Sequence, residues 1–220
     1  MRNRNPVYNR DMFASRPFVH WVLLHLAAFL FSPFCFMLAG WLVMALLSAE
    51  ANSPPGAGQM TTYAKALFLL APFLTGLLLG ALVSWLQIMA MRNSAVKVKP
   101  LRWLIPGMLG LGLACLAFAW TFSSLVFAYP LLMAALFSAC AYGLAGALPQ
   151  THLLSSQVED SWRWLLFSLL AALLAIPLAC APVWLTESPA YFWLVFPLAA
   201  LGGVLFGLLT GFILIRKVNP

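Results

Sequence analysis

Charged side chains are scarce in this sequence. Asp, Glu, Lys and Arg make up 8% of its 220 residues, whereas hydrophobic residues make up 64%. A soluble domain usually has about 25% charged residues, and its core cannot cover so large an apolar surface. The composition therefore predicts a protein that lies in lipid.

Acidic side chains are missing from the interiors of the apolar runs. The five acids, Asp11, Glu50, Glu159, Asp160 and Glu187, lie outside these runs or at their ends. Intramembrane charges mark ion paths and proton relays, so the sequence predicts neither a cation antiporter nor an intramembrane metalloprotease. The net charge of +7 comes from basic residues between apolar runs and predicts no nucleic-acid partner.

Cysteine is also rare, and no Cys-x-x-Cys motif occurs. The four cysteines each fall inside an apolar run: Cys35, Cys115, Cys140 and Cys180. We interpret them as small buried side chains rather than as a disulfide framework or a zinc site. No serine in these runs has a clear base at a readable spacing, so no catalytic residue is predicted.

Six apolar runs are long enough to cross a bilayer, which takes about 20 mostly apolar residues. They cover approximately residues 18–48, 63–91, 103–126, 128–154, 164–186 and 189–215. The first is too long for a signal-peptide core and is interpreted as an uncleaved anchor. The sequence predicts an all-α membrane protein with six transmembrane helices, a single integral membrane domain over residues 1–220 that begins with a basic cytoplasmic segment, residues 1–17.

Basic residues fall almost entirely on one side of these runs. Of the 12 Lys and Arg residues, 11 lie before the first run, between the second and third, between the fourth and fifth, or after the sixth. Only Lys65 lies on the other side. By the positive-inside rule, both termini are predicted to be cytoplasmic, in a multi-pass protein of the bacterial inner membrane. The stretch Arg92–Arg102 would meet anionic lipid headgroups.

Small residues recur at a fixed spacing in the second, fourth and sixth runs, each time followed by a polar residue. The three sets are Gly76, Gly80, Ser84 and Gln87; Ala139, Gly143, Ala147 and Gln150; and Ala199, Gly203, Gly207 and Thr210. Spacings of four, four and three place each set on one face of a helix. Because small residues let backbones approach in lipid, these sets are predicted to be helix-packing faces.

The first, third and fifth runs open on a tryptophan, namely Trp21, Trp103 and Trp164. The alternation divides the chain into three pseudo-repeated helical hairpins, formed by spans two and three, four and five, and six and one. The last pair is a permuted unit, so the three hairpins could close into a pseudo-threefold ring.

The pattern "GxxxSxxQxxxxR", a short loop with "RW", and the final "GGVLFGLLTGFILIR" resemble a loose group of bacterial multi-pass membrane proteins. Members of that group repeat a Gly-rich, Gln-containing helix and then a Trp-led helix, and the group has no established activity. The resemblance covers spans two to six, departing at Gln150, which lacks the following Arg, and at Thr210, which replaces Gln. It implies an internal repeat and supplies no catalytic residue.

The candidate interior polar residues are Gln87, Gln150, His25, His152 and Thr210. In the simplest interpretation the amides and His25 form hydrogen bonds between helices. Alternatively these residues line a ligand pocket, or His25 and His152 hold a haem or pigment metal, since neutral imidazole is a common ligand. No cofactor is expected under the first interpretation.

The composition and the motifs leave three functions open. The first is a structural or accessory membrane protein that packs through its small-residue faces against another membrane subunit or a second copy. The second is a small permease, or a membrane substrate-binding component, for an uncharged or lipophilic ligand. The third is a haem- or pigment-binding membrane protein. In each case the bilayer is the immediate partner.

Overall fold

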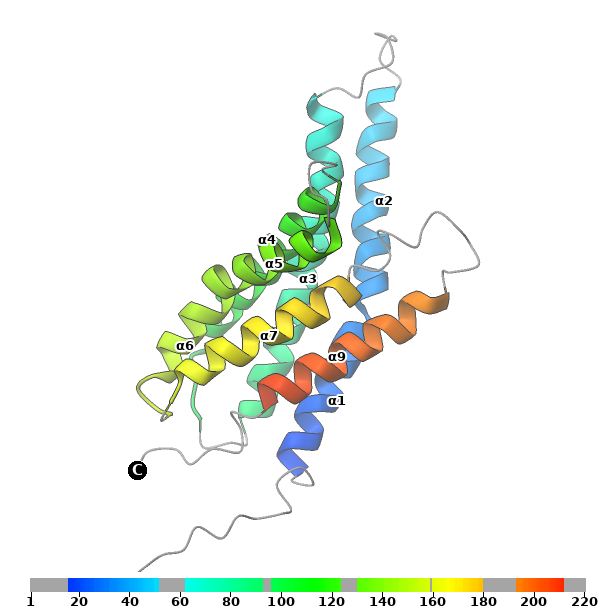
Figure 1. Ribbon diagram of the computed structural model, residues 1–220. Coiled ribbons are helices and arrows are strands. Elements are labelled where there is room, and N and C mark those ends of the chain that lie inside the picture. The colour runs from blue at the N-terminus through cyan, green and yellow to red at the C-terminus, as the bar shows by residue number, and fades with distance from the viewer. Residues whose placement is uncertain are drawn as a thin grey trace, which may run out of the picture.

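The computed structural model describes residues 16–51, 62–92, 96–123, 130–158, 160–179 and 193–211. Within these ranges the fold is all-helical (Figure 1). The elements are α1 (Arg16–Leu30), α2 (Ser32–Ala51), α3 (Thr62–Met91), α4 (Pro100–Ser123), α5 (Pro130–Tyr142), the π-helical segment η2 (Gly143–Ala147), α6 (Leu148–Leu154), α7 (Trp162–Ala179) and α9 (Val195–Gly211).

Four stretches of helix are long and apolar enough to cross a membrane. They are Phe18–Ala39, Leu69–Met91, Pro100–Thr121 and Pro130–Leu154. Two further apolar helices, Trp162–Leu178 and Val195–Gly211, are shorter, and parts of the fifth and sixth predicted runs lie outside the described residues. The chain therefore has the helices of a membrane protein, while six crossings remain a prediction.

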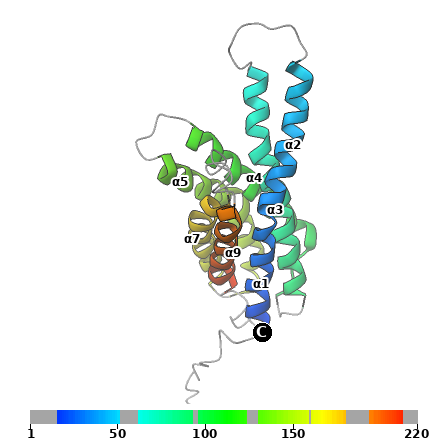
Figure 2. The ribbon, with the colours of Figure 1, turned by 90° about the vertical axis from the view of Figure 1, so that its right-hand side faces the viewer.

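The first predicted span consists of two helices that meet at Phe31. The proline at position 33 has no backbone N–H, which is tolerated only in the first turn of a helix, so α2 begins afresh at Ser32. The helical bonding resumes at once, since the Cys35 N–H donates to Phe31 O at 3.0 Å. Figure 2 shows the result, in which α2 and the first half of α3 extend together beyond the other helices.

The contacts between the helices form a closed cycle. Going round, α3 packs against α4, α4 against α5, α5 against α7, α7 against α9, α9 against α1, and α1 against α3. The last described helix thus lies beside the first, as Figure 1 shows. Among the described residues, the interior is packed with alanines and with large apolar side chains such as Phe29, Phe118, Tyr142 and Phe206, each at most 2% exposed.

Glycines set how closely two of these helix pairs approach. A Cβ on Gly80 would lie 2.6 Å from Gly107 O and 2.7 Å from Met108 Cα, so α3 and α4 touch backbone to backbone. A Cβ on Gly203 would lie 2.6 Å from His25 O, which gives α9 and α1 the same kind of contact. No residue with a side chain fits at such distances. The proposed packing residues are all buried: Gly76, Gly80, Ser84, Gly143, Ala147, Gly203 and Gly207.

The third small-residue set lies in the helix formed by α5, η2 and α6, which is built differently because it widens at η2. Pro149 lacks an N–H and would clash with the carbonyl four residues earlier in a regular helix. The wider turn accommodates it, and the Leu148 N–H donates to Gly143 O, five residues back. Within η2, Gly146 lies against α4, where a Cβ on Gly110 would be 2.7 Å from Gly146 Cα. Gly143 instead faces the end of the Leu169 side chain in α7.

Candidate functional site

Three buried tryptophans from three helices meet inside the bundle, near the end that carries the α3–α4 loop. They are Trp21 of α1, Trp103 of α4 and Trp164 of α7, and each is at most 3% exposed. The ring centroids of Trp103 and Trp164 are 5.4 Å apart, and those of Trp21 and Trp164 are 6.4 Å apart in an edge-to-face arrangement. Such contacts stabilise aromatic pairs beyond their burial, so the three rings form one cluster.

A chain of hydrogen bonds joins this cluster to α3. The Trp103 indole N–H donates to Gln87 Oε1 at 2.9 Å, and Gln87 Nε2 lies 3.0 Å from His25 Nε2. His25 Nδ1 in turn lies 2.8 Å from Trp21 O. Gln87 and His25 are at most 2% exposed, and these contacts link α4, α3 and α1 directly.

The indole group fixes the direction of every bond in that chain. Because Trp103 Nε1 can only donate, the Gln87 oxygen must face it and the Gln87 NH₂ must face His25. His25 Nε2 is then the acceptor, which leaves the proton on Nδ1, where it is donated to Trp21 O. The bonds therefore specify the neutral Nδ1–H tautomer of His25, with both ring nitrogens engaged.

A second tryptophan is bonded in the same way. The Trp21 indole N–H donates to Thr210 Oγ1 of α9 at 3.1 Å, and the Thr210 hydroxyl donates to Phe206 O at 2.6 Å. Thr210 therefore takes the acceptor role toward Trp21 that Gln87 takes toward Trp103. Together the two sets of bonds tie α9, α1, α3 and α4 into one polar network.

Gln150 and Trp164 lie at the edge of this network. Gln150 Nε2 makes a long bond of 3.4 Å to Trp103 O. On this side of the cluster, three nearly inaccessible polar atoms have no hydrogen-bond partner in the structure: Gln150 Oε1, Trp164 Nε1 and Ser168 Oγ. Leaving a buried group unpaired costs about 1–3 kcal/mol, so this side of the cluster is the less stable one.

The structure thus brings together most of the polar residues singled out in the sequence. His25, Gln87 and Thr210 belong to the bonded network, Gln150 borders it, and His152 is exposed on α6. Sequence reasoning missed the tryptophans as members of the site, although the indole groups of Trp103 and Trp21 donate two of its bonds. The available signal was the repeat itself, which pairs each Trp with a Gln or Thr at similar depth.

The arrangement does not present a metal-ligand pair. A metal would need a lone pair on His25, whose Nε2 accepts from Gln87 and whose Nδ1 carries the proton. His152, the second histidine considered, is exposed on α6, whereas His25 is 2% exposed. Within the described part of the chain, no group of three or more His, Cys, Asp or Glu residues could hold a metal ion.

What the cluster can do chemically is bond helices to one another. All of its groups are neutral amide, indole, hydroxyl and imidazole groups. Apart from two bonds to a backbone carbonyl of the same helix, the hydrogen bonds described above cross between helices. Comparison with family models, with curated proteins and with solved structures gives no match.

Proposed function

We propose that this protein is a structural or accessory component of the bacterial inner membrane, with six transmembrane helices in three pseudo-equivalent hairpins around a filled interior. It works without a cofactor and packs in the bilayer with another membrane subunit or a second copy. Both termini and the α3–α4 loop face the cytoplasm. No side chain is assigned a catalytic role.

The observation that carries the proposal is the filling of the interior. Where a permease would keep space for a ligand, commonly about 300–1,000 Å³, Trp21, Trp103, Phe118, Tyr142 and Phe206 are packed at no more than 2% exposure. The interior amide Gln87 already has partners on both sides. These groups are occupied in bonding helices, which favours the structural role over ligand capture.

Two of the three proposed hairpins share a bonding pattern that supports the repeat. In the α3–α4 pair and in the α9–α1 pair, glycines bring backbones together and a tryptophan donates to a polar residue of the partner helix. The α5–α6 segment with α7 carries the same sequence pattern. The resemblance to multi-pass proteins with repeated Gln-containing helices agrees with this division.

The basic loops support the orientation. The Lys97 N–H donates to Gln157 Oε1 at 2.8 Å, and Gln157 Nε2 donates to Lys97 O at 2.7 Å. These two bonds hold the α3–α4 and α6–α7 loops at the same end of the bundle, so that Arg92, Lys99 and Arg163 gather there. By the positive-inside rule this end is the cytoplasmic one.

Purified protein in lipid nanodiscs provides the test. We expect no member of a panel of uncharged and lipophilic metabolites to raise its thermal stability, no Soret band, and a stoichiometric membrane partner or a dimer after cross-linking in native membranes. A stabilising ligand whose effect is lost in Gln87→Leu, but kept in the lipid-facing control Trp85→Leu, would favour the permease instead. A Soret band would favour a haem protein.

A further inference from the structure

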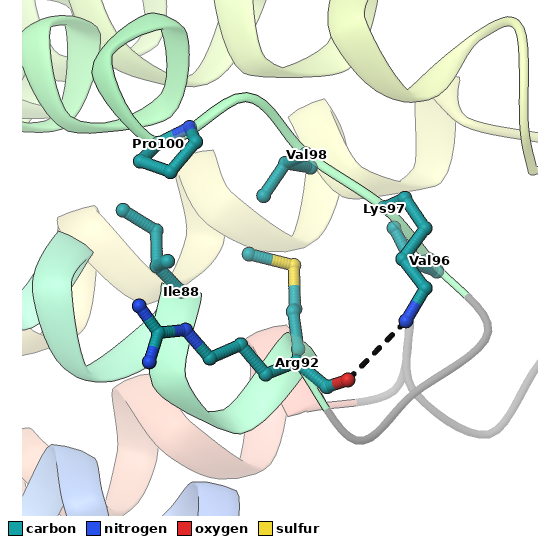
Figure 3. A pocket seen from close by; sticks show the side chains of 7 residues that line it. Ile88, Arg92, Val96, Lys97, Val98 and Pro100 are labelled. Carbon is teal, nitrogen blue, oxygen red and sulfur yellow. Dashed lines mark hydrogen bonds between the residues drawn. The ribbon is translucent and has the colours of Figure 1, made fainter.

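A small pocket lies under the loop that joins α3 to α4, at the end of the bundle where the basic loops meet. It measures about 180 Å³ and is formed by the last turn of α3, the segment 96–99 and the start of α4. Its lining residues are Ile88, Met91, Arg92, Val96, Lys97, Val98 and Pro100 (Figure 3). Five of these are apolar and two are cationic.

The apolar side of the pocket is formed by well-packed side chains. Ile88, Met91 and Val96 are at most 4% exposed and belong to the same packed cluster as Trp103 and Trp164. The loop above them is held by the two hydrogen bonds between Lys97 and Gln157. The pocket is therefore part of the packed end of the bundle, and a bound molecule would find it already formed.

The two cations stand at opposite sides of this apolar surface. In Figure 3 the guanidinium of Arg92 extends along one side and Lys97 lies on the other. Lys97 Nζ donates one hydrogen bond to Arg92 O at 3.2 Å, which leaves two of its three N–H groups for another acceptor. Both side chains are exposed at the mouth, and none of the described residues that line the pocket is acidic.

This combination selects a phosphate attached to an apolar body. Arg and Lys bind phosphate oxygens through charge-assisted hydrogen bonds, and a free phosphate ion would gain nothing from five apolar walls. A phospholipid supplies both parts, with its phosphate between the cations and its glycerol region against Val98 and Pro100. Basic pockets at the cytoplasmic ends of transmembrane helices bind anionic headgroups in this way.

We propose that the α3–α4 pocket binds one anionic phospholipid, with its phosphate between Arg92 and Lys97. The site rests on the proposed membrane embedding, because it draws its ligand from the surrounding leaflet. The lipid would fix the loop to the bilayer surface at the point where α3 and α4 are joined to the tryptophan cluster.

Native mass spectrometry of the full chain, with phosphatidylglycerol and phosphatidylcholine of identical acyl chains, tests the site. We expect one phosphatidylglycerol to be retained in preference to phosphatidylcholine. Arg92→Gln or Lys97→Gln should each weaken that binding about fivefold, which corresponds to about 1 kcal/mol per basic residue near a membrane surface. Val98→Phe, which fills the pocket without changing its charge, should weaken it as well.

Lys99→Gln and Arg102→Gln are the matched controls, because Lys99 in the loop and Arg102 in the first turn of α4 are exposed cations that do not line the pocket. If they weaken binding as much as Arg92→Gln does, or if phosphatidylcholine is retained equally, the attraction is general and the site is refuted. Inorganic phosphate competing at millimolar concentration would show a site for the free ion and also overturn the lipid proposal. Carbonate extraction of the same variants separates the two claims: protein released from membranes would contradict the membrane embedding itself.

Discussion

Two helix pairs of this protein carry the same sequence pattern and differ in their bonding. In the α3–α4 pair, Gln87 joins the Trp103 indole to His25, and the backbones touch at Gly80. In the pair of α5–α6 with α7, Gln150 Oε1 and the Trp164 indole N–H are buried without partners. Gly143 there faces only the end of a side chain. Similar residues at similar spacing therefore do not guarantee similar contacts.

The physical reason for the difference is the widened turn of η2. A set of residues spaced four and three apart shares one face only while the helix keeps about 3.6 residues per turn. The π-helical turn before Pro149 adds about one residue to the turn, which rotates α6 and Gln150 with it. The α3 helix also contains a proline, Pro72, but it precedes Gly76 and so leaves the turns from Gly76 to Gln87 in register.

The largest difference between the two pairs should appear when a methyl group is added at the glycines. Gly80→Ala places a Cβ 2.6 Å from a backbone oxygen and 2.7 Å from a backbone carbon that cannot move independently, so we expect it to lower the free energy of unfolding by about 3 kcal/mol. Gly143→Ala meets the flexible end of Leu169 and should change it by less than about 1 kcal/mol. Equilibrium unfolding in mixed micelles, followed by circular dichroism, measures both. Equal tolerance of the two changes would contradict the close backbone contact.

Replacing the two glutamines should give the next largest contrast. Gln87→Leu leaves the Trp103 N–H and His25 Nε2 buried without partners, and we expect a loss of about 2–4 kcal/mol from the two groups. Gln150→Leu removes one long bond together with an unpaired carbonyl, so its effect should stay within about 1 kcal/mol. The same unfolding titration compares them, and the conservative variant Gln87→Glu at low pH should recover part of the loss. A larger loss in Gln150→Leu would show that Gln150 has partners that the structure does not contain.

The sequence predicted the helices and their small-residue faces, but it did not predict the breaks within the helices or the hydrogen bonds between them. The apolar runs and the glycine spacing predict helices, and the glycines at 80 and 203 do lie at backbone contacts. The break at Phe31 and the wide turn at Gly143–Ala147 depend on where a proline's missing N–H can be accommodated. The helical periodicity alone does not carry that information. The hydrogen-bond network could not be predicted from spacing along the chain either, because two of its members, Trp21 and Thr210, are 189 positions apart.

A double-mutant cycle distinguishes a bonded tryptophan–glutamine pair from an unbonded one. We expect Trp103→Phe and Gln87→Leu to show a coupling energy of about 1–2 kcal/mol, since each removes the same hydrogen bond. For Trp164→Phe and Gln150→Leu the coupling should be below about 0.5 kcal/mol, because no bond joins the two residues in the structure. Unfolding is followed by circular dichroism because the tryptophans themselves are altered. A coupling above 1 kcal/mol in the second pair would reveal a hydrogen bond from a third indole group, and the α5–α6 and α7 pair would then be bonded like the α3–α4 pair.

The last contrast concerns two buried hydroxyl groups, and it includes the only substitution that is expected to be favourable. Ser168 Oγ in α7 has no hydrogen-bond partner in the structure, so Ser168→Ala relieves a buried unpaired group and should raise the free energy of unfolding by up to about 1 kcal/mol. Thr210→Val has nearly the same shape as the native residue but removes the acceptor of the Trp21 indole, and should lower it by about 1–3 kcal/mol. The opposite signs follow from pairing alone, because both side chains are at most 1% exposed. Destabilisation by Ser168→Ala would mean that the hydroxyl is bonded in the membrane, and that the α7 side of the cluster is completed there by a group such as an ordered water.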